Sequence, residues 1–176
     1  HSPRPDLAKK YPSFKDKAKQ YRVDTKFESL QQSKDFSKEF PINLTTGRLV
    51  NFSGAGMETR ASKYLSRITP EMFADIHPEL AAKHGIKNWD YVWVHSPEGT
   101  KIKVRARIVP SVKPDTIFLP FHWAGYMQGV DMTGNFPEGT RPFAVGESAN
   151  TVTNYGYDIV TQIPETKGGL CRIEKA

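Results

Sequence analysis

Hydrophobic and polar positions alternate most clearly between residues 91 and 109, where the pattern predicts a β-hairpin. The segment 91–95 is β-branched and aromatic, and the turn-forming residues Pro97-Glu98-Gly99 follow it. In 101–109 apolar residues alternate with Lys and Arg, and a period of two places the two sets on opposite faces of a strand. We therefore expect one face that packs on a core and one basic face.

Shorter apolar stretches predict the remaining strands. They cover residues 42–45, 72–76, 116–122 and 170–174. The segment 77–84 predicts a helix, because Pro78 suits the first helical position and Gly85 suits the end. Many short strands with one or two short helices indicate a mainly β protein. We expect its sheet to close into a barrel, since closure leaves no unpaired strand edge.

Two segments lack these patterns. Residues 1–39 are rich in Lys, Asp, Gln and Ser, so we interpret them as a partly irregular connector or extension before a domain at 40–176. A basic interaction arm is the alternative for this segment. Residues 123–168 are dense in Gly, Asn, Thr and Pro, and so long a loop is usually functional or disordered. The chain starts without Met, so we expect it to begin inside a longer protein or after a removed segment.

Composition and charge narrow the function classes. The net charge of +6 favours an anionic partner, such as nucleic acid, a phosphate-bearing cofactor or an acidic subunit. A single cysteine, Cys171, excludes an internal disulfide and any multi-Cys metal site, and we interpret it as core packing. No apolar run approaches the roughly 20 residues of a membrane span, so no direct membrane insertion is expected. P-loop, Gly-rich dinucleotide, zinc-protease and Cys-x-x-Cys motifs are all absent.

The sequence does offer residues suited to phosphate and purine groups. The segment Thr45-Thr46-Gly47-Arg48 ends a predicted strand with two hydroxyls, a Gly that permits close backbone approach, and a guanidinium. His122 and Trp123 follow another strand and offer a stacking and hydrogen-bonding edge. Asn150 can recognise an amide edge, and Lys167 can neutralise a phosphate. Each has an ordinary alternative: a strand-ending turn, an aromatic corner or a surface charge.

The basic face of the strand at 101–107 has two interpretations. It could bind nucleic acid or an acidic subunit, but most such faces are simply the solvated side of a half-buried strand. No aromatic residue is interleaved with the Lys and Arg residues of this strand. That absence argues against nucleic acid, because single strands bind through stacked bases.

Several segments, taken in their order along the chain, resemble one family. They are Phe40-Pro41, Leu44-Thr45-Thr46-Gly47-Arg48-Leu49, 77–86, 92–99, Pro120-Phe121-His122-Trp123, Ala149-Asn150-Thr151 and Pro164-Glu165-Thr166-Lys167. Over about residues 40–176 the chain resembles the C-terminal domain of the dimethyl sulfoxide reductase superfamily, most closely that of formate dehydrogenase catalytic subunits. The resemblance implies a six-stranded double-psi β-barrel of the aspartate-decarboxylase-like kind. After Arg48 many relatives carry a Glu-His-Trp-His-like run, where this chain has Asn51-Phe52-Ser53-Gly54.

The resemblance also implies a function. The full-length enzyme would hold bis(molybdopterin guanine dinucleotide) with Mo or W and oxidise formate to CO2. By the same resemblance, the cofactor-binding residues are Thr45, Thr46, Gly47, Arg48, His122, Trp123, Asn150 and Lys167. Catalytic and metal-ligating residues would lie in other domains, so the isolated domain is expected to be neither catalytic nor loaded with cofactor.

The implied partners are the remaining domains of the same catalytic subunit and an iron–sulfur electron-transfer subunit. By analogy with respiratory formate dehydrogenases, the bacterial periplasm is favoured over the cytoplasm. Two alternatives stay open: the same domain of a nitrate reductase, which shares the Leu-Thr-Thr-Gly-Arg element, and a cofactor-free barrel that binds polyanions or protein. A self-processing decarboxylase with this barrel cleaves a Gly-Ser bond, and the chain contains no Gly-Ser pair.

Overall fold

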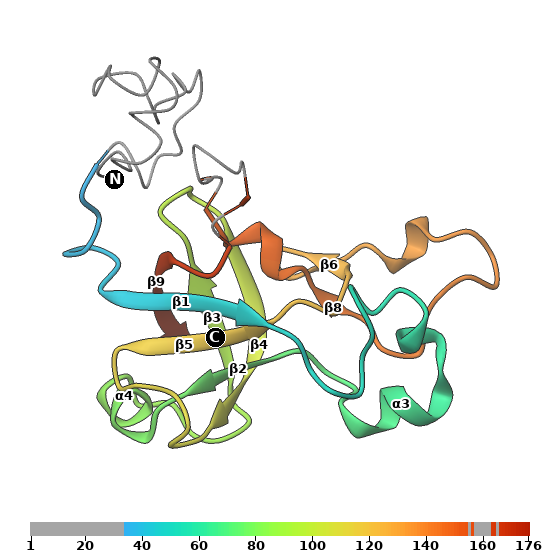
Figure 1. The fold of residues 1–176 in the computed structure, drawn as a ribbon, viewed down its shortest axis with the longest axis horizontal. Coiled ribbons are helices and arrows are strands. Elements are labelled where there is room, and N and C mark those ends of the chain that lie inside the picture. Colours follow the sequence, from blue (N-terminus) through green and yellow to red (C-terminus); the bar gives the residue numbers. More distant parts are fainter. Residues whose placement is uncertain (1–33, 155, 157–162, 165) are drawn as a thin grey trace, which may run out of the picture.

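A computed structural model describes residues 34–154, 156, 163–164 and 166–176 of the chain. In this part, six strands close into a barrel in the order β1-β5-β2-β4-β3-β9 (Figure 1). The strands are β1 (Ile42–Gly47), β2 (Phe73–Ile76), β3 (Tyr91–His95), β4 (Lys101–Ile108), β5 (Thr116–Pro120) and β9 (Gly169–Lys175). Each coincides with a strand predicted from the sequence, although β5 ends two residues earlier than expected.

The pairing of these strands identifies the barrel. β1 pairs with β5 and β2 with β4 in parallel, whereas β1–β9, β2–β5, β3–β4 and β3–β9 are antiparallel. Because β9 returns to β1, the barrel has no unpaired edge. Two parallel pairs in a closed six-stranded sheet form a double-psi β-barrel, so the predicted fold class is confirmed.

The barrel interior is filled by the apolar positions of the alternating pattern. On β4, Ile102, Val104 and Ala106 are at most 1% exposed, while the Lys and Arg residues between them face outward. The inward residues of the other strands are Ile42, Leu44, Ala74, Ile76, Val92, Val94, Ile117, Leu119, Cys171 and Ile173. Burial raises the pKa of the Cys171 thiol, which confirms that this cysteine is core packing.

Helix α4 (Pro78–Lys83) forms where the sequence predicts it, and α3 (Lys63–Ile68) was not predicted. The His77 ring accepts a hydrogen bond from the Glu79 N–H at 3.2 Å and caps α4, which Gly85 follows at φ 63°. Four of the six residues of α3 are exposed, and at fewer than two turns the helix is too short for a helical period to show in the sequence. Short 3-10 turns lie at η2 (Thr59–Ala61), η3 (Thr133–Asn135) and η4 (Ala149–Thr151).

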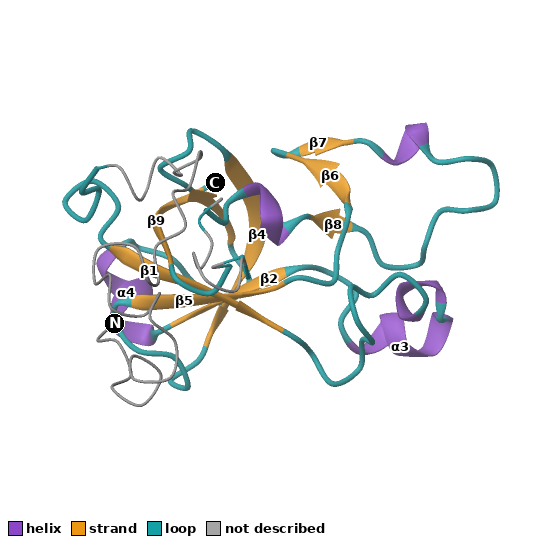
Figure 2. Ribbon diagram, turned by 45° about the horizontal axis from the view of Figure 1, so that its top comes forward, coloured by secondary structure: helices purple, strands orange, loops and turns teal. Residues whose placement is uncertain are grey.

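The segment 123–168, expected to be a long loop, contains a small second sheet. It consists of β6 (Gly125–Met127), β7 (Val130–Asp131) and β8 (Gly146–Glu147), in the order β7-β6-β8 (Figure 2). The carboxylate of Glu147, which is 1% exposed, holds this sheet to the barrel. It accepts backbone N–H groups from Gln128 at 3.0 Å, from Gly129, and from Lys103 of β4 at 3.3 Å.

The basic face of β4 differs from the sequence prediction, because the neighbouring strands supply aromatic rings. Lys101 Nζ lies 4.2 Å from the Trp93 ring centroid, and Arg105 Cζ lies 3.7 Å from that of Tyr91. Tyr91 and Trp93 belong to β3, which pairs with β4, so the sequence of β4 alone does not reveal these rings. The cations occupy ring faces on which a base would stack, so these aromatics do not favour nucleic acid.

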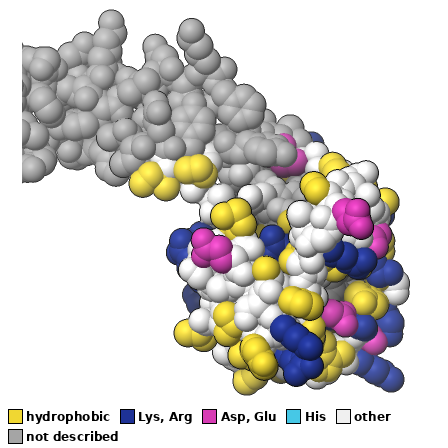
Figure 3. Space-filling model, turned by 90° about the vertical axis from the view of Figure 1, so that its right-hand side faces the viewer, with side chains coloured by type: hydrophobic (Ala, Val, Ile, Leu, Met, Phe, Trp, Pro, Cys, Tyr) yellow, Lys and Arg dark blue, Asp and Glu magenta, His cyan; other side chains and the backbone are white. Residues whose placement is uncertain are grey.

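Helix α3 and the segment 133–145 extend from the barrel as a lobe (Figures 1 and 2). Large apolar side chains on the lobe and on the loop after β1 are at least 65% exposed: Val50, Met57, Tyr64, Ile68 and Phe143. Figure 3 faces the lobe side of the molecule and shows hydrophobic side chains exposed among Lys and Arg. Within the described residues, no helix is both long and apolar enough to cross a membrane.

Candidate functional site

The parallel pairing of β1 and β5 brings two of the predicted site segments together. Gly47 pairs with Pro120, so Arg48 and His122 both follow strands that end at the same rim of the barrel. The Arg48 guanidinium carbon lies 5.3 Å from the Phe121 ring centroid. The Leu49 N–H donates to His122 Nε2 at 2.7 Å, which directly joins the two strand-terminal loops.

The antiparallel pairing of β1 and β9 adds a third segment. Leu44 pairs with Gly169, and the Thr46 hydroxyl donates to the Thr166 carbonyl oxygen at 3.0 Å. Lys167 therefore lies at the same rim as Thr46, with its own side chain exposed. Thr45, the residue before Thr46 on β1, is half-buried. The structure thus gathers Thr45 to Arg48, His122 and Lys167 at one rim.

The His122 ring is fully buried in an aromatic cluster. Its centroid lies 5.4 Å from that of Phe52 and 6.1 Å from that of Trp123. Burial is the main cause and lowers the pKa of His122; a contact with the Gly54 backbone raises it by less, and nearby Arg48 and Arg60 lower it slightly further. The ring is therefore neutral at pH 7, with its proton on Nδ1 because Nε2 accepts from Leu49.

Two polar atoms of this cluster are incompletely satisfied within the described residues. Trp123 Nε1 is buried and makes no hydrogen bond there, and buried His122 Nδ1 has only the Gly54 backbone nearby, without good hydrogen-bond geometry. Buried donors without partners are costly, so they mark a place where another polar group would be favourable. His122 and Trp123 are consecutive in the chain and follow β5 after one intervening residue, Phe121.

The positive charge of the rim is not neutralised within the described part of the chain. Arg48 is exposed and makes no ion pair there. Arg60 is half-buried, and among the described residues its guanidinium donates to backbone carbonyls alone, those of Gly56 at 3.2 Å and Ala124 at 3.4 Å. Burial lowers the pKa of Arg60, as expected for a cation held without an acidic partner. Unpaired guanidinium groups at a rim of exposed loops suit an anionic ligand.

Two glycines determine how closely the loops approach each other. A Cβ at Gly47 would lie 2.6 Å from Phe118 Cε2, so this position serves packing between β1 and β5. This packing is an internal reason for the small residue, and the close approach of a ligand to Gly47 stays a prediction. Gly56 has φ 80°, and a Cβ there would lie 2.6 Å from the His122 carbonyl oxygen. The loop 53–56 therefore forms a wall against His122.

Asn150 is the predicted site residue that the structure does not join to the others. It lies in η4, exposed, and within the described residues its amide makes no hydrogen bond. η4 is instead tied to the β3–β4 turn, where the Thr100 hydroxyl donates to the Thr151 carbonyl. Further along, Asn154 Nδ2 donates to the Gly168 carbonyl at 3.4 Å, which connects this segment to the neighbourhood of Lys167.

Comparison with protein families decides the affiliation of this barrel. The family model described as "Molydopterin dinucleotide binding domain" matches residues 42–170, from the start of β1 into β9. The chain belongs to this family. The rim residues therefore belong to a barrel of the molybdopterin-dinucleotide-binding family.

Curated relatives of this family member include subunits named as formate dehydrogenases and as a nitrate reductase. The chain is 35% identical over 137 residues to F420-dependent formate dehydrogenase 1 subunit alpha of Methanococcus maripaludis, covering 78% of this chain and 17% of that protein. It is 33% identical over 147 residues to formate dehydrogenase 2 subunit alpha (cytochrome c-553) of Nitratidesulfovibrio vulgaris, covering 83% and 14%. It is 36% identical over 96 residues to the assimilatory nitrate reductase catalytic subunit of Bacillus subtilis, covering 54% and 13%.

The chain thus spans less than a fifth of the length of these relatives. Among solved structures, acetylene hydratase from Pelobacter acetylenicus matches with a TM-score of 0.62 at 19% identity, covering 81% of this chain and 19% of that one. At that identity the likeness shows the fold alone. Within the described residues, no group of three or more His, Cys, Asp or Glu is placed to hold a metal ion.

The rim of this molybdopterin-family barrel includes two residues that sequence reasoning did not select. Phe52, where the resemblance noted a departure, packs against both His122 and Trp123, with ring centroids 5.4 Å and 5.3 Å away. Arg60 reaches the rim from η2, an irregular element with no sequence pattern of its own. Only the departure after Arg48 could have drawn attention to Phe52, and no local signal marks Arg60.

Acidification should destabilise the domain through His122. The unfolded chain has an ordinary His pKa near 6.5, and folding lowers it, so the unfolded state binds more protons below that pH. The contribution of neutral His122 to the free energy of unfolding is complete above about pH 6.5 and is lost as pH falls. The free energy of unfolding then changes by at most about 1.4 kcal/mol per pH unit for this one proton. Urea unfolding at pH 7.5, 6.5 and 5.5 measures this slope.

The variant His122→Gln keeps an acceptor for the Leu49 N–H but cannot titrate, so its stability should depend less on pH. His84→Gln is the comparison variant: burial and Lys83 lower the pKa of His84 as well, so it should remove only the part of the acid slope that His84 contributes and leave that of His122. If His122→Gln retained the full acid slope of the wild type, the buried neutral imidazole would not be the cause.

Proposed function

We propose that this domain belongs to the catalytic subunit of a formate dehydrogenase and holds bis(molybdopterin guanine dinucleotide) with Mo or W. The observation that carries the proposal is the convergence of Arg48, His122 and Lys167 at one barrel rim within a family named for dinucleotide binding. Formate is favoured because two relatives named as formate dehydrogenase subunits match 78% and 83% of the chain, whereas the nitrate reductase subunit matches 54%.

The rim residues fit a group with phosphates and a polar heterocycle. Arg48 and Lys167 would face phosphate oxygens, since neither makes an ion pair within the described residues. Trp123 Nε1, which has no hydrogen-bond partner within the described residues, and His122 Nδ1, which has only the Gly54 backbone nearby, would be further donors for such a ligand. Thr45, Thr46 and Gly47 would line the strand end, and Asn150 would contact the cofactor from η4. When bound, the cofactor would supply the redox chemistry, while this domain binds and orients it.

In this proposal the reactive centre lies outside the domain, in the rest of the catalytic subunit. The proposed partners are those remaining domains and an iron–sulfur electron-transfer subunit, and the bacterial periplasm is the favoured compartment. The chain alone would then show no turnover. The coding sequence flanking this segment is expected to encode iron–sulfur cysteine motifs and a molybdenum ligand.

A nitrate reductase subunit is the second candidate, favoured by the 36% identity to the Bacillus subtilis catalytic subunit over 96 residues. The two candidates share the cofactor and differ in substrate. The cofactor-free, polyanion-binding barrel is the rival of a different class. It predicts binding that falls steeply with salt and does not distinguish bases.

Isothermal titration of the chain with GDP tests the cofactor proposal, with ADP as the matched nucleotide and heparin as the polyanion. We expect GDP to bind at one site and more tightly than ADP, because the proposed cofactor carries guanine. Equal affinity for both nucleotides, or steeply salt-dependent heparin binding without GDP binding, would favour the polyanion barrel instead.

A further inference from the structure

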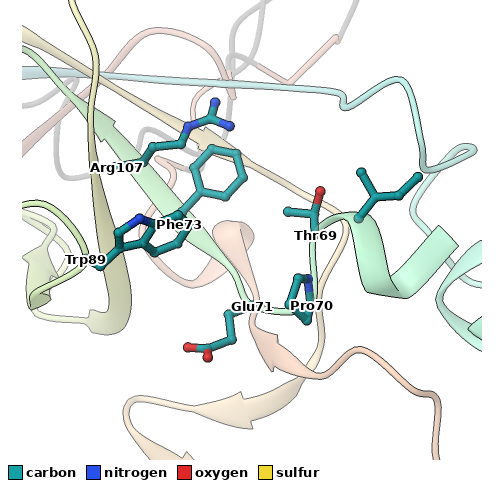
Figure 4. A pocket seen from close by; sticks show the side chains of 7 residues that line it. Thr69, Pro70, Glu71, Phe73, Trp89 and Arg107 are labelled. Atoms are coloured by element: carbon teal, nitrogen blue, oxygen red, sulfur yellow. The ribbon is translucent and has the colours of Figure 1, made fainter. Parts of the chain in front are cut away.

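A pocket away from the barrel rim of Arg48 and His122 lies between the end of α3 and the turn before β3. Its volume is about 220 Å³, and its lining includes Thr69, Pro70, Glu71, Phe73, Trp89 and Arg107 (Figure 4). Figure 4 shows Trp89 on one side and Thr69 with Pro70 on the opposite side. A pocket of this size can take one large side chain. We call it the Trp89 pocket.

Trp89 stands in a backbone conformation that a bulky residue rarely adopts. Its φ is 68°, and its side chain is 51% exposed. Backbone bonds fix this turn without help from the indole: the Trp89 N–H donates to the Ala106 carbonyl at 2.7 Å, and Asp90 N–H to that of Lys87 at 3.1 Å. A glycine would take this φ without strain. The indole is thus costly for the backbone and little used by the core, which points to a role at the surface.

The charges that line the Trp89 pocket are already paired. Arg107 binds the Asp75 carboxylate through two bonds, of 2.5 Å and 2.8 Å, and lies over the Phe73 ring. Glu71 accepts from Arg105 Nε at 2.7 Å. A charged group entering the pocket would have to compete with these pairs, so the pocket itself suits an apolar side chain.

Helix α3, whose last residue Ile68 lines the Trp89 pocket, carries exposed apolar residues and, next to them in sequence, exposed positive charge. Ile68 lines the pocket and Tyr64 lies one helical turn away on the same face of α3, and they are 66% and 79% exposed. Lys63 and Arg67 are exposed on α3, and within the described residues neither makes an ion pair. An occupant would therefore gain from apolar contact inside the Trp89 pocket and from negative charge facing Lys63 and Arg67 beside it.

We propose that the Trp89 pocket is a docking site for an acidic protein segment. The segment inserts one large apolar side chain between Trp89 and Pro70, and its Asp or Glu residues face Lys63 and Arg67. This proposal concerns a protein partner and does not depend on the cofactor bound at the rim.

NMR titration of the isotope-labelled chain tests the docking site with a capped peptide, acetyl-Asp-Glu-Leu-Trp-Glu-Asp-amide. We expect shift changes at Ile68, Phe73 and the Trp89 indole N–H, and weaker binding at higher salt. The same peptide with Asn and Gln in place of its acids should bind several-fold more weakly. Shifts confined to Arg48 and His122 would instead show an anion captured at the rim and would overturn the proposal.

Two variants separate docking from folding. Trp89→Gly should weaken peptide binding at least tenfold while leaving the Tm unchanged or higher, since glycine relieves the strained φ. Lys63→Gln with Arg67→Gln should weaken binding and flatten its salt dependence. The control Lys38→Gln with Lys113→Gln removes the same charge at exposed sites outside the pocket and should bind like the wild type. Wild-type affinity in Trp89→Gly would overturn the proposal.

Discussion

Replacing Arg48 with alanine is expected to weaken GDP binding by roughly ten- to one hundredfold, the loss of charge-assisted hydrogen bonds worth about 1.5–3 kcal/mol. The guanidinium is exposed, lies over Phe121 and makes no ion pair within the described residues, so it is available to a phosphate. For the same reason its removal should hardly change the Tm. Isothermal titration at fixed ionic strength and thermal unfolding measure the two effects.

Two further variants make the result specific. Arg48→Lys keeps the charge but loses the planar, two-pronged donor, so its affinity should fall between those of wild type and alanine. Lys113→Ala removes one exposed charge before the start of β5, at the opposite end of that strand from His122, and should bind GDP normally. Equal losses in Arg48→Ala and Lys113→Ala would mean that only net charge matters.

Replacing Glu147 with alanine should destabilise the domain by about 3 kcal/mol, because buried backbone donors left without partners cost about 1–3 kcal/mol each. The carboxylate serves N–H groups of Lys103, Gln128 and Gly129, and the side chain is almost fully buried. For a chain of this size the Tm should fall by about 6–12 °C. Urea unfolding and calorimetry measure both quantities.

The matched control for Glu147→Ala is Glu138→Ala, since Glu138 is exposed and makes no ion pair within the described residues. Its Tm should stay at the wild-type value. Hydrogen exchange should also localise the effect of Glu147→Ala to the β6–β7 hairpin, which lies against Trp93 so closely that a Cβ at Gly129 would be 2.5 Å from the ring. Equal Tm values for the two variants would show that the Glu147 carboxylate does not hold the hairpin.

The small sheet that Glu147 holds to the barrel could not be predicted from the sequence. An acidic residue between Gly146 and Ser148 looks like part of a surface loop, and the strands β6 to β8 are only two or three residues long. Strands this short carry no periodicity. Their existence depends on a carboxylate that reaches backbone groups 18 to 44 residues away in sequence.

The candidate site was predicted as a set of residue types, and the structure adds their arrangement. The segment Thr45 to Arg48, His122 and Lys167 were selected for their chemistry, and the barrel places them at one rim. Asn150 was selected on the same basis and stays apart from them within the described residues. Whether each of these residues contacts cofactor stays a prediction, as does the connector at 1–39, of which residues 1–33 lie outside the described part.

The sequence by itself determined the strands of the barrel and helix α4. Alternation on β4 and the Pro78 and Gly85 signals are local, because burial of one strand face and capping of one helix involve residues close together in the chain. The tertiary structure alone decided that Leu49 meets His122, 73 residues away, and that Thr46 meets Thr166, 120 residues away. Those contacts follow from which strands pair and in which register, and a strand's own pattern of apolar residues does not specify its partner.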